Sequence, residues 1–215
     1  MKTTKKALVL ALCAVLLVAF TVFATMAYLT STSAVQNTFT VGNVEITLDE
    51  ADVDIYGKEI ANADRVTANE YKLMPGHTYV KDPTVHVAAD SEEAYIRMIV
   101  TISDFADVKA VLGADFLPQN FVKGWDSTKW ISTGVVTENT TDNTASYEFR
   151  YYTTVSTVDA GAIDLEPLFT HIVMPGDINN TNLAKLEELQ IDVVAHAIQA
   201  DGFTVETAWA TFDAE

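Results

Sequence analysis

Four carboxylates in the first third of the chain have a spacing that could bind a metal ion: Asp49, Glu50, Asp52 and Asp54. The pair at 52 and 54 starts like the calcium loop of an EF-hand, which needs another oxygen donor two residues later and a bidentate glutamate at its end. Tyr56 and Ala63 occupy those two positions. The cluster is therefore a candidate only for a loose calcium site, and a solvated acidic loop is the alternative interpretation.

The histidines are the next residues that could hold a metal ion: His77, His86, His171 and His196. A zinc peptidase typically needs two histidines one helical turn apart with an adjacent glutamate as the base, as in His-Glu-x-x-His. The sequence contains no such motif, and no Gly-x-Ser-x-Gly, phosphate loop or dinucleotide fingerprint. We therefore predict no catalytic residue, no zinc centre and no cofactor.

Five aromatic residues lie in or near one predicted hairpin: Trp125, Trp130, Tyr147, Tyr151 and Tyr152. Exposed rings of this kind can stack on sugars, which would suit a carbohydrate-binding surface. Aromatic side chains also supply much of the buried area of protein cores. The sequence favours the core interpretation and leaves the sugar site as its alternative.

Composition restricts the possible partners. The 215-residue chain carries 30 acidic residues against 13 lysines and arginines, which gives a formal net charge of -17. Such an excess repels phosphate backbones and anionic membrane surfaces, so nucleic acid is excluded as a partner. Cys13 is the only cysteine in the sequence, so no intramolecular disulfide can form.

The N-terminus has the pattern of an export signal. Residues 1–6 are basic, and residues 7–27 run without a charge. Thr25 and Ala27 place small side chains three residues and one residue before a signal peptidase site, which predicts a signal peptide cleaved between Ala27 and Tyr28. An uncleaved membrane anchor is the alternative, because about 20 apolar residues can cross a bilayer.

Hydrophobic periodicity beyond the signal predicts short strands separated by turns. The expected strands cover residues 38–48, 77–88, 94–103, 128–138, 145–157, 168–174 and 189–200. Short helices are expected at residues 104–112, 181–186 and 203–212. Ser103 or Asp104 is expected to cap the first of these helices. The pattern predicts an all-β sandwich over residues 39–215, with a few short helices in loops and at the C-terminus.

Residues 94–103 show the clearest alternation. The even positions from Ala94 to Ile102 are all apolar, whereas the odd positions include Arg97. We expect the even face to pack in the core. A charge introduced there by Met98→Asp should prevent folding, and Arg97→Asp on the other face should be much milder.

A family resemblance rests on several stretches that sample most of the chain: residues 27–31, 35–44, 73–76, 81–83, 94–97 and 195–203. They include Leu-Met-Pro-Gly at 73–76 and Ala-Tyr-Ile-Arg at 94–97. Together these stretches resemble the TasA/camelysin family of exported proteins, whose export depends on a SipW-type signal peptidase.

The resemblance implies a jelly-roll-like form of the β-sandwich and assembly into biofilm matrix fibres. In such fibres an N-terminal strand released by signal cleavage completes the sheet of the next subunit. Residues 28–38 suit that role, because they carry no charge and no proline. The candidate interface residues of this donor strand are Leu29, Val35 and Phe39. A flexible tail, or a strand within its own subunit's sheet, is the alternative.

We therefore expect a secreted, non-enzymatic fibre subunit in the extracellular matrix or at the surface of a Gram-positive-type bacterium. Its expected partners are further copies of itself, the SipW-type signal peptidase, and other matrix proteins or polysaccharide. A membrane is expected as a partner only through an uncleaved signal segment. A camelysin-type secreted metallopeptidase and a monomeric surface- or carbohydrate-binding sandwich are the alternatives.

Overall fold

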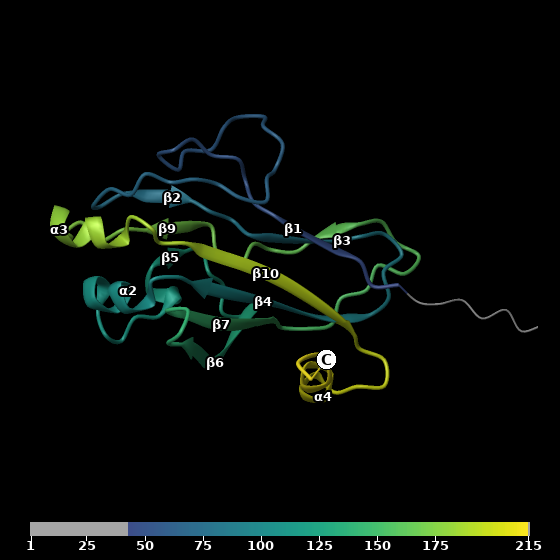
Figure 1. The fold of residues 1–215 in the computed structure, drawn as a ribbon. Helices are drawn as coiled ribbons and strands as arrows, with labels where there is room; N and C mark the ends of the chain where they lie inside the picture. Colours follow the sequence, from purple (N-terminus) through teal and green to yellow (C-terminus); the bar gives the residue numbers. More distant parts are fainter. Residues whose placement is uncertain (1–42, 215) are drawn as a thin grey trace, which may run out of the picture. The chain divides into compact units, whose positions relative to one another are not determined.

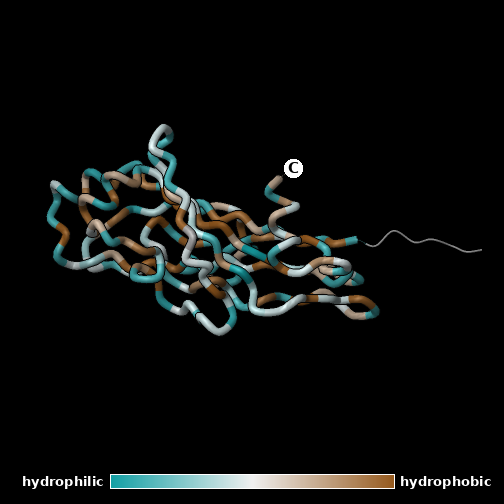
Figure 2. The backbone as a smooth tube through the Cα atoms, turned by 90° about the horizontal axis from the view of Figure 1, so that it is seen from below, coloured by the Kyte–Doolittle hydropathy of each residue, from teal (hydrophilic) through white to brown (hydrophobic). Residues whose placement is uncertain are grey.

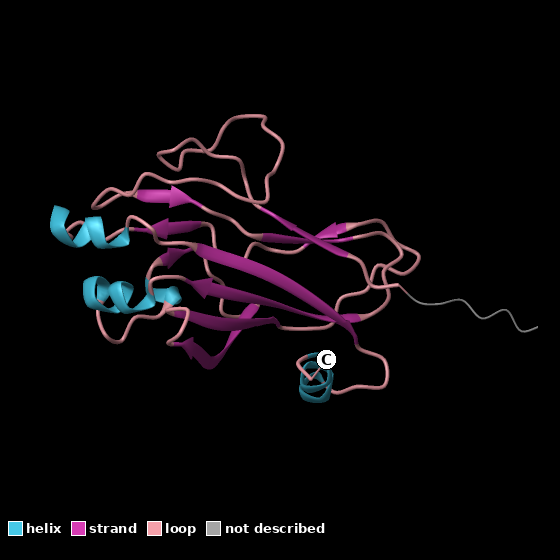
Figure 3. Cartoon of the chain, in the orientation of Figure 1, coloured by secondary structure: helices cyan, strands magenta, loops and turns pink. Residues whose placement is uncertain are grey.

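The computed structural model describes residues 43–214, and this part of the chain is mostly β (Figures 1 and 3). Its strands are β1 (Ile46–Asp49), β2 (Thr78–Val80), β3 (Thr84–Val87), β4 (Ala94–Ile102), β5 (Val122–Lys123), β6 (Trp130–Asn139), β7 (Thr144–Tyr151), β8 (Ile163–Asp164), β9 (His171–Val173) and β10 (Ile191–Gln199). Its helices are α2 (Phe105–Leu112), η1 (Pro118–Asn120), α3 (Asn180–Leu183), η2 (Ala184–Leu186) and α4 (Val205–Phe212).

The strands form antiparallel sheets. One sheet has four strands in the order β10-β4-β7-β6, and two smaller ones have the orders β1-β3-β8 and β2-β9-β5. The helices lie outside the sheets, with α2 and α3 near one end and α4 across the outer side of the four-stranded sheet (Figure 3).

Strand β4 forms the centre of the core, as its alternation predicts. The even residues from Ala94 to Ile102 are all at most 2% exposed. The core also takes Val85 from β3, Phe149 from β7 and Leu168 from the segment before β9, so side chains from several sheets share it. Figure 2 shows that short apolar and polar stretches alternate along the backbone.

The expected hairpin is confirmed by the pairing of β6 with β7, and the long apolar strand near the C-terminus is confirmed as β10. All three expected helical segments are also present, within two residues of the expected bounds. Two-residue strands β5 and β8 were not expected, because a run that short carries no readable periodicity.

The predicted cap of helix α2 is wrong. Asp104 adopts a left-handed conformation, with φ of 48°, and its side chain makes no capping hydrogen bond. The first N–H groups of the helix are capped instead by Asn143, which lies in the turn between β6 and β7. Its carbonyl accepts from Phe105 N–H at 2.9 Å, and its side-chain Oδ1 accepts from Ala106 N–H at 3.0 Å. The helix start is thus set by a residue far away in the sequence.

The expectation that Arg97 tolerates substitution assumed an exposed side chain, but helix α4 covers this position. Arg97 does face away from the core, yet it is only 3% exposed. Its guanidinium lies 4.4 Å from the ring centre of Trp209 and 5.1 Å from that of Phe212. It also donates hydrogen bonds of 3.0 and 2.5 Å to the carboxylate of Asp213. Helix α4 therefore creates a second buried layer on this side of the sheet.

Within residues 43–214, no helix combines the length and the apolar composition that a bilayer crossing requires.

Candidate functional site

Strand β10 has a free edge. It is the outermost strand of the four-stranded sheet and pairs with β4 along all nine of its residues. Ser103 N–H donates to the Gln190 carbonyl at 3.1 Å, and Ala200 N–H donates to the Glu93 carbonyl at 2.8 Å. Since hydrogen-bonded and non-bonded pairs alternate in an antiparallel ladder, the even residues of β10 bond to β4 and the odd ones direct their N–H and C=O groups outward. Within residues 43–214, no backbone hydrogen bond completes this outer row.

The core is incompletely covered beneath this edge. The odd residues of β10 stand opposite the buried row of β4, so they face the core. Nevertheless Ile191, Val193, Ala195 and Ala197 are only half-buried, whereas their partners in β4 are at most 2% exposed. Strand β1 lies beside β10 without a hydrogen-bonded ladder to it. One further strand at this edge would complete both the ladder and the core.

The opposite edge of the same sheet is protected. Strand β6 carries a register shift between Ser132 and Val136, and Gly134 within it has φ of 72°. A bulge of this kind bends an edge strand and prevents a second chain from pairing along it. Strand β10 has no register shift in its pairing with β4. The two edges therefore differ, and only β10 offers a long regular row of free groups among the strands described here.

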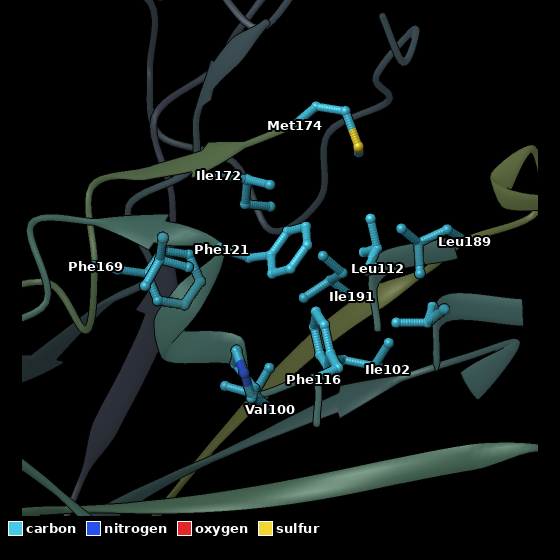
Figure 4. A pocket seen from close by; sticks show the side chains of 13 residues that line it. Val100, Ile102, Leu112, Phe116, Phe121, Phe169, Ile172, Met174, Leu189 and Ile191 are labelled. Carbon is cyan, nitrogen blue, oxygen red and sulfur yellow. The ribbon is translucent and has the colours of Figure 1, made fainter. Parts of the chain in front are cut away.

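An apolar cavity lies at the start of β10 (Figure 4). Its lining is wholly apolar: Val100, Ile102, Val108, Leu112, Phe116, Pro118, Phe121, Val122, Phe169, Ile172, Met174, Leu189 and Ile191. In the close-up, Ile191 and Leu189 approach the space from the β10 side, and Met174 and Ile172 approach it from the β9 side. The cavity therefore suits an apolar group and no polar one.

The calcium candidate Asp49 is engaged by cations. It forms an ion pair with Arg65, whose guanidinium also bonds Asp82 at 2.8 Å. His86 lies between two carboxylates, with Nε2 2.8 Å from Asp49 and Nδ1 2.6 Å from Asp164. Burial disfavours both charges, but the hydrogen bonds outweigh it, so the pKa of Asp49 is lowered and the pKa of His86 is raised. This cluster ties β1, β3 and β8 together.

The other calcium candidates have different surroundings. Glu50 is buried and accepts a 2.6 Å hydrogen bond from Lys81. Asp54 closes a turn, where its carboxylate accepts from the N–H groups of Tyr56 and Lys58 at 2.9 and 3.0 Å. Asp52 contributes its backbone carbonyl to Ile60 N–H. The structure does not bring the four carboxylates together, and residues 43–214 contain no group of three His, Cys, Asp or Glu side chains placed to hold a metal ion.

The four histidines lie apart from one another. His77 Nε2 is 2.7 Å from the carbonyl of Tyr56, and His171 Nδ1 is 2.8 Å from the hydroxyl of Thr170. His196 is on the outer face of β10, where burial and then the charge of Arg97 lower its pKa. With His86 held in the cluster on β3, each histidine has its own local partner and no two share one.

The aromatic residues of the hairpin mostly pack inward. Trp130 and Tyr147 are at most 4% exposed. Trp125 donates from Nε1 to the Trp130 carbonyl at 2.8 Å, and Tyr151 donates its hydroxyl to Glu166 at 2.6 Å. Tyr152 is 50% exposed, but the Lys129 ammonium lies 4.6 Å from its ring centre. A sugar-stacking surface would therefore have one exposed ring here, already in contact with a cation.

The predicted cleavage residues Ala27 and Tyr28, and the predicted interface residues Leu29, Val35 and Phe39, lie outside the described residues. The free edge of β10 and the cavity were not predicted, because the sequence shows neither which strand is outermost nor which distant side chains line a space. Comparisons with protein-family models, with curated proteins and with solved structures found no match.

Proposed function

We propose that this chain is a secreted structural subunit of extracellular matrix or surface fibres. Residues 28–38 of one subunit add a strand to the free edge of β10 in the next subunit. The observation that carries the proposal is the unpaired outer row of β10 above a half-covered core. Strand addition to such an edge satisfies the open backbone groups and buries alternate side chains.

We further propose that the antiparallel sheets form a jelly-roll-like β-sandwich of the kind found in the TasA/camelysin family. The shared core, to which several sheets contribute, supports this arrangement. The resemblance of the sequence supports it too. The segment assigned as the donor strand is uncharged and free of proline, so every one of its backbone groups can join a ladder.

A proline on each side of the proposed contact tests the mechanism. Val35→Pro removes a donor from the incoming strand. Ala195→Pro removes an N–H that faces outward from β10, so the ladder between β10 and β4 keeps all its hydrogen bonds. Both variants should remain folded monomers that form no fibres in electron micrographs. Ala195→Ser, which keeps the N–H, should assemble. Normal fibres from both proline variants would eliminate strand addition at β10.

A second assay separates the alternatives. The secreted protein is incubated with casein, with and without a chelator, and inspected for fibres in parallel. Fibres without cleavage support the structural role. Chelator-sensitive cleavage would point to the camelysin-type peptidase, and a monomer that does neither would point to a surface- or carbohydrate-binding module.

A further inference from the structure

We infer that the side chains of Lys81 and Asn69 join in an intramolecular amide, an isopeptide bond, and that Glu50 carries the protons of this reaction. The reaction releases ammonia and ties the long loop between β1 and β2 to the segment that follows β2. The inference does not depend on fibre formation. It rests on the way in which the structure brings these side chains together.

The carboxylate of Glu50 bridges the two nitrogen atoms that would exchange places. Its Oε2 accepts a 2.6 Å hydrogen bond from the Lys81 ammonium, and its Oε1 accepts one of 2.9 Å from the side-chain amide of Asn69. These partners are 31 and 19 residues away from Glu50 in the sequence, so only the fold brings them together. Both distances are within the range in which a general acid–base group transfers a proton.

The site is largely closed to water. Glu50 and Lys81 are buried, and Asn69 is half-buried. The neighbouring Tyr71 donates its hydroxyl to the Val80 carbonyl at 3.0 Å, and burial, followed by the charge of Glu50, raises the pKa of this hydroxyl. In such surroundings, the transfer of one proton from Lys81 to Glu50 replaces a buried ion pair by two neutral groups and frees the lone pair of Nζ for attack.

The side-chain amide of Asn69 is held at both of its ends. Val53 N–H donates to Oδ1 at 3.1 Å, and Nδ2 donates to the Ala51 carbonyl at 2.9 Å as well as to Glu50. A fixed amide next to a fixed amine favours intramolecular attack, because little orientational freedom remains to be lost. The Val53 N–H is also placed to stabilise the negative charge that develops on Oδ1 during the attack.

The reaction balances with these groups alone. The neutral Nζ of Lys81 attacks Cγ of Asn69, and the electron pair of the carbonyl moves onto Oδ1. Glu50 gives its proton to Nδ2 and takes a second proton from Nζ. The bond between Cγ and Nδ2 then breaks, the carbonyl re-forms, and ammonia leaves with the last proton from Glu50 as ammonium. One C–N bond forms and another breaks, so nothing is oxidised or reduced.

The bond restrains a loop that no disulfide can hold. Residues 50–77 form the long connection between β1 and β2 (Figure 1), and residues 43–214 contain no cysteine. The isopeptide bond closes residues 69–81 into a ring and holds the end of the loop against Glu50 at its start. Such a restraint acts as a disulfide does, because it limits the freedom of the unfolded chain.

Mass spectrometry of the purified, folded chain tests the inference. The chain should be lighter by one ammonia, about 17 Da, than the mass calculated from its sequence and its measured N-terminus. Trypsin should release residues 66–72 joined to residues 73–97, because it cleaves after Lys72 but not after a modified Lys81. A folded chain with the full calculated mass, or a digest in which these peptides are separate, would overturn the inference.

Three variants assign the roles. Lys81→Arg and Glu50→Gln should each keep the full calculated mass, the first for want of the nucleophile and the second for want of the proton carrier. Lys72→Arg, at an exposed lysine of the same loop, is the matched control and should lose ammonia. A loss that persists in Lys81→Arg would mean a succinimide at an asparagine, which joins no peptides, and a loss that persists in Glu50→Gln would remove Glu50 from the reaction; either result overturns the inference. The peptide map of the natural chain decides the question even where a variant fails to fold.

Discussion

Arg97 holds helix α4 on the outer face of the four-stranded sheet. Its guanidinium is enclosed by the rings of Trp209 and Phe212 and paired with Asp213. The hydrogen bonds from Arg97 outweigh the effect of burial and lower the pKa of Asp213. A single side chain therefore combines packing, charge pairing and cation–π contact at one attachment point.

Arg97→Ala is expected to lower the free energy of unfolding by about 3 kcal/mol, because it empties a buried site and removes the ion pair and the cation–π contacts that Arg97 makes with α4 and Asp213. Urea denaturation followed by tryptophan fluorescence measures this loss and reports on Trp209. Arg150→Ala is the control, since Arg150 lies beside Glu148 on a more exposed part of the same face. An effect no larger than that of the control would show that α4 is held mainly by its other contacts.

His86 should make stability depend on pH. Because the pKa of His86 is raised, the stabilisation that its protonated ring gives to the folded state is complete below the ordinary histidine pKa of 6.5. This stabilisation is lost as the pH rises through the pKa of the folded state. The lowered pKa of Asp49 gives a contribution that is present above its ordinary value of 3.8 and lost as the pH falls through its lowered value. The cluster is thus complete between about pH 4 and pH 6.5.

The difference in unfolding free energy between the natural chain and His86→Gln should therefore be larger at pH 5.5 than at pH 8. Denaturation at the two pH values measures it. The lowered pKa of His196 makes the folded state less stable at low pH, which opposes the effect of His86. Both proteins contain His196, so its effect cancels in the difference between their unfolding free energies. An equal difference at both pH values would mean that His86 acts through packing alone.

Strand β4 supports the core at the scale of an element. Met98→Asp should prevent folding, because the site is 0% exposed and offers an aspartate no partner, at a cost of more than about 4 kcal/mol. Circular dichroism and gel filtration of the purified chain measure the outcome. Val194→Asp, at a 50% exposed position on the outer face of β10, is the control and should fold. A folded Met98→Asp protein would contradict the assignment of the core face.

The same elements show what sequence alone can predict. The long strands β4 and β10 were readable because their side chains alternate or run apolar over about nine residues. The cap of α2 and the burial of Arg97 were not, since each depends on a segment distant in the sequence. The candidate site divides in the same way: the donor segment was inferred from the sequence, whereas the edge that could receive it became visible only in three dimensions.

At the scale of the whole molecule, charge opposes the proposed assembly. A subunit with a net charge of -17, or near -20 without its basic N-terminal segment, repels its neighbours. The critical concentration for assembly should therefore fall as the salt concentration rises, because screening weakens this repulsion more than it weakens backbone hydrogen bonds. It should also fall as the pH is lowered toward the pI of about 4.4. Light scattering across a salt series measures the effect, and a critical concentration that rises with salt would contradict it.

The bulge in β6 also determines what kind of polymer such a molecule can make. A sheet with two regular edges can grow sideways without limit, and stacked strands of that kind produce the cross-β ribbons of amyloid. In the proposed fibre, the irregular edge at Gly134 would stop lateral growth, while β10 would accept a single strand and then be closed. Growth of that fibre would be confined to one dimension, and each link would add a whole folded domain. Fibre diffraction should accordingly show an axial repeat set by the domain, without a dominant meridional reflection at 4.7–4.8 Å.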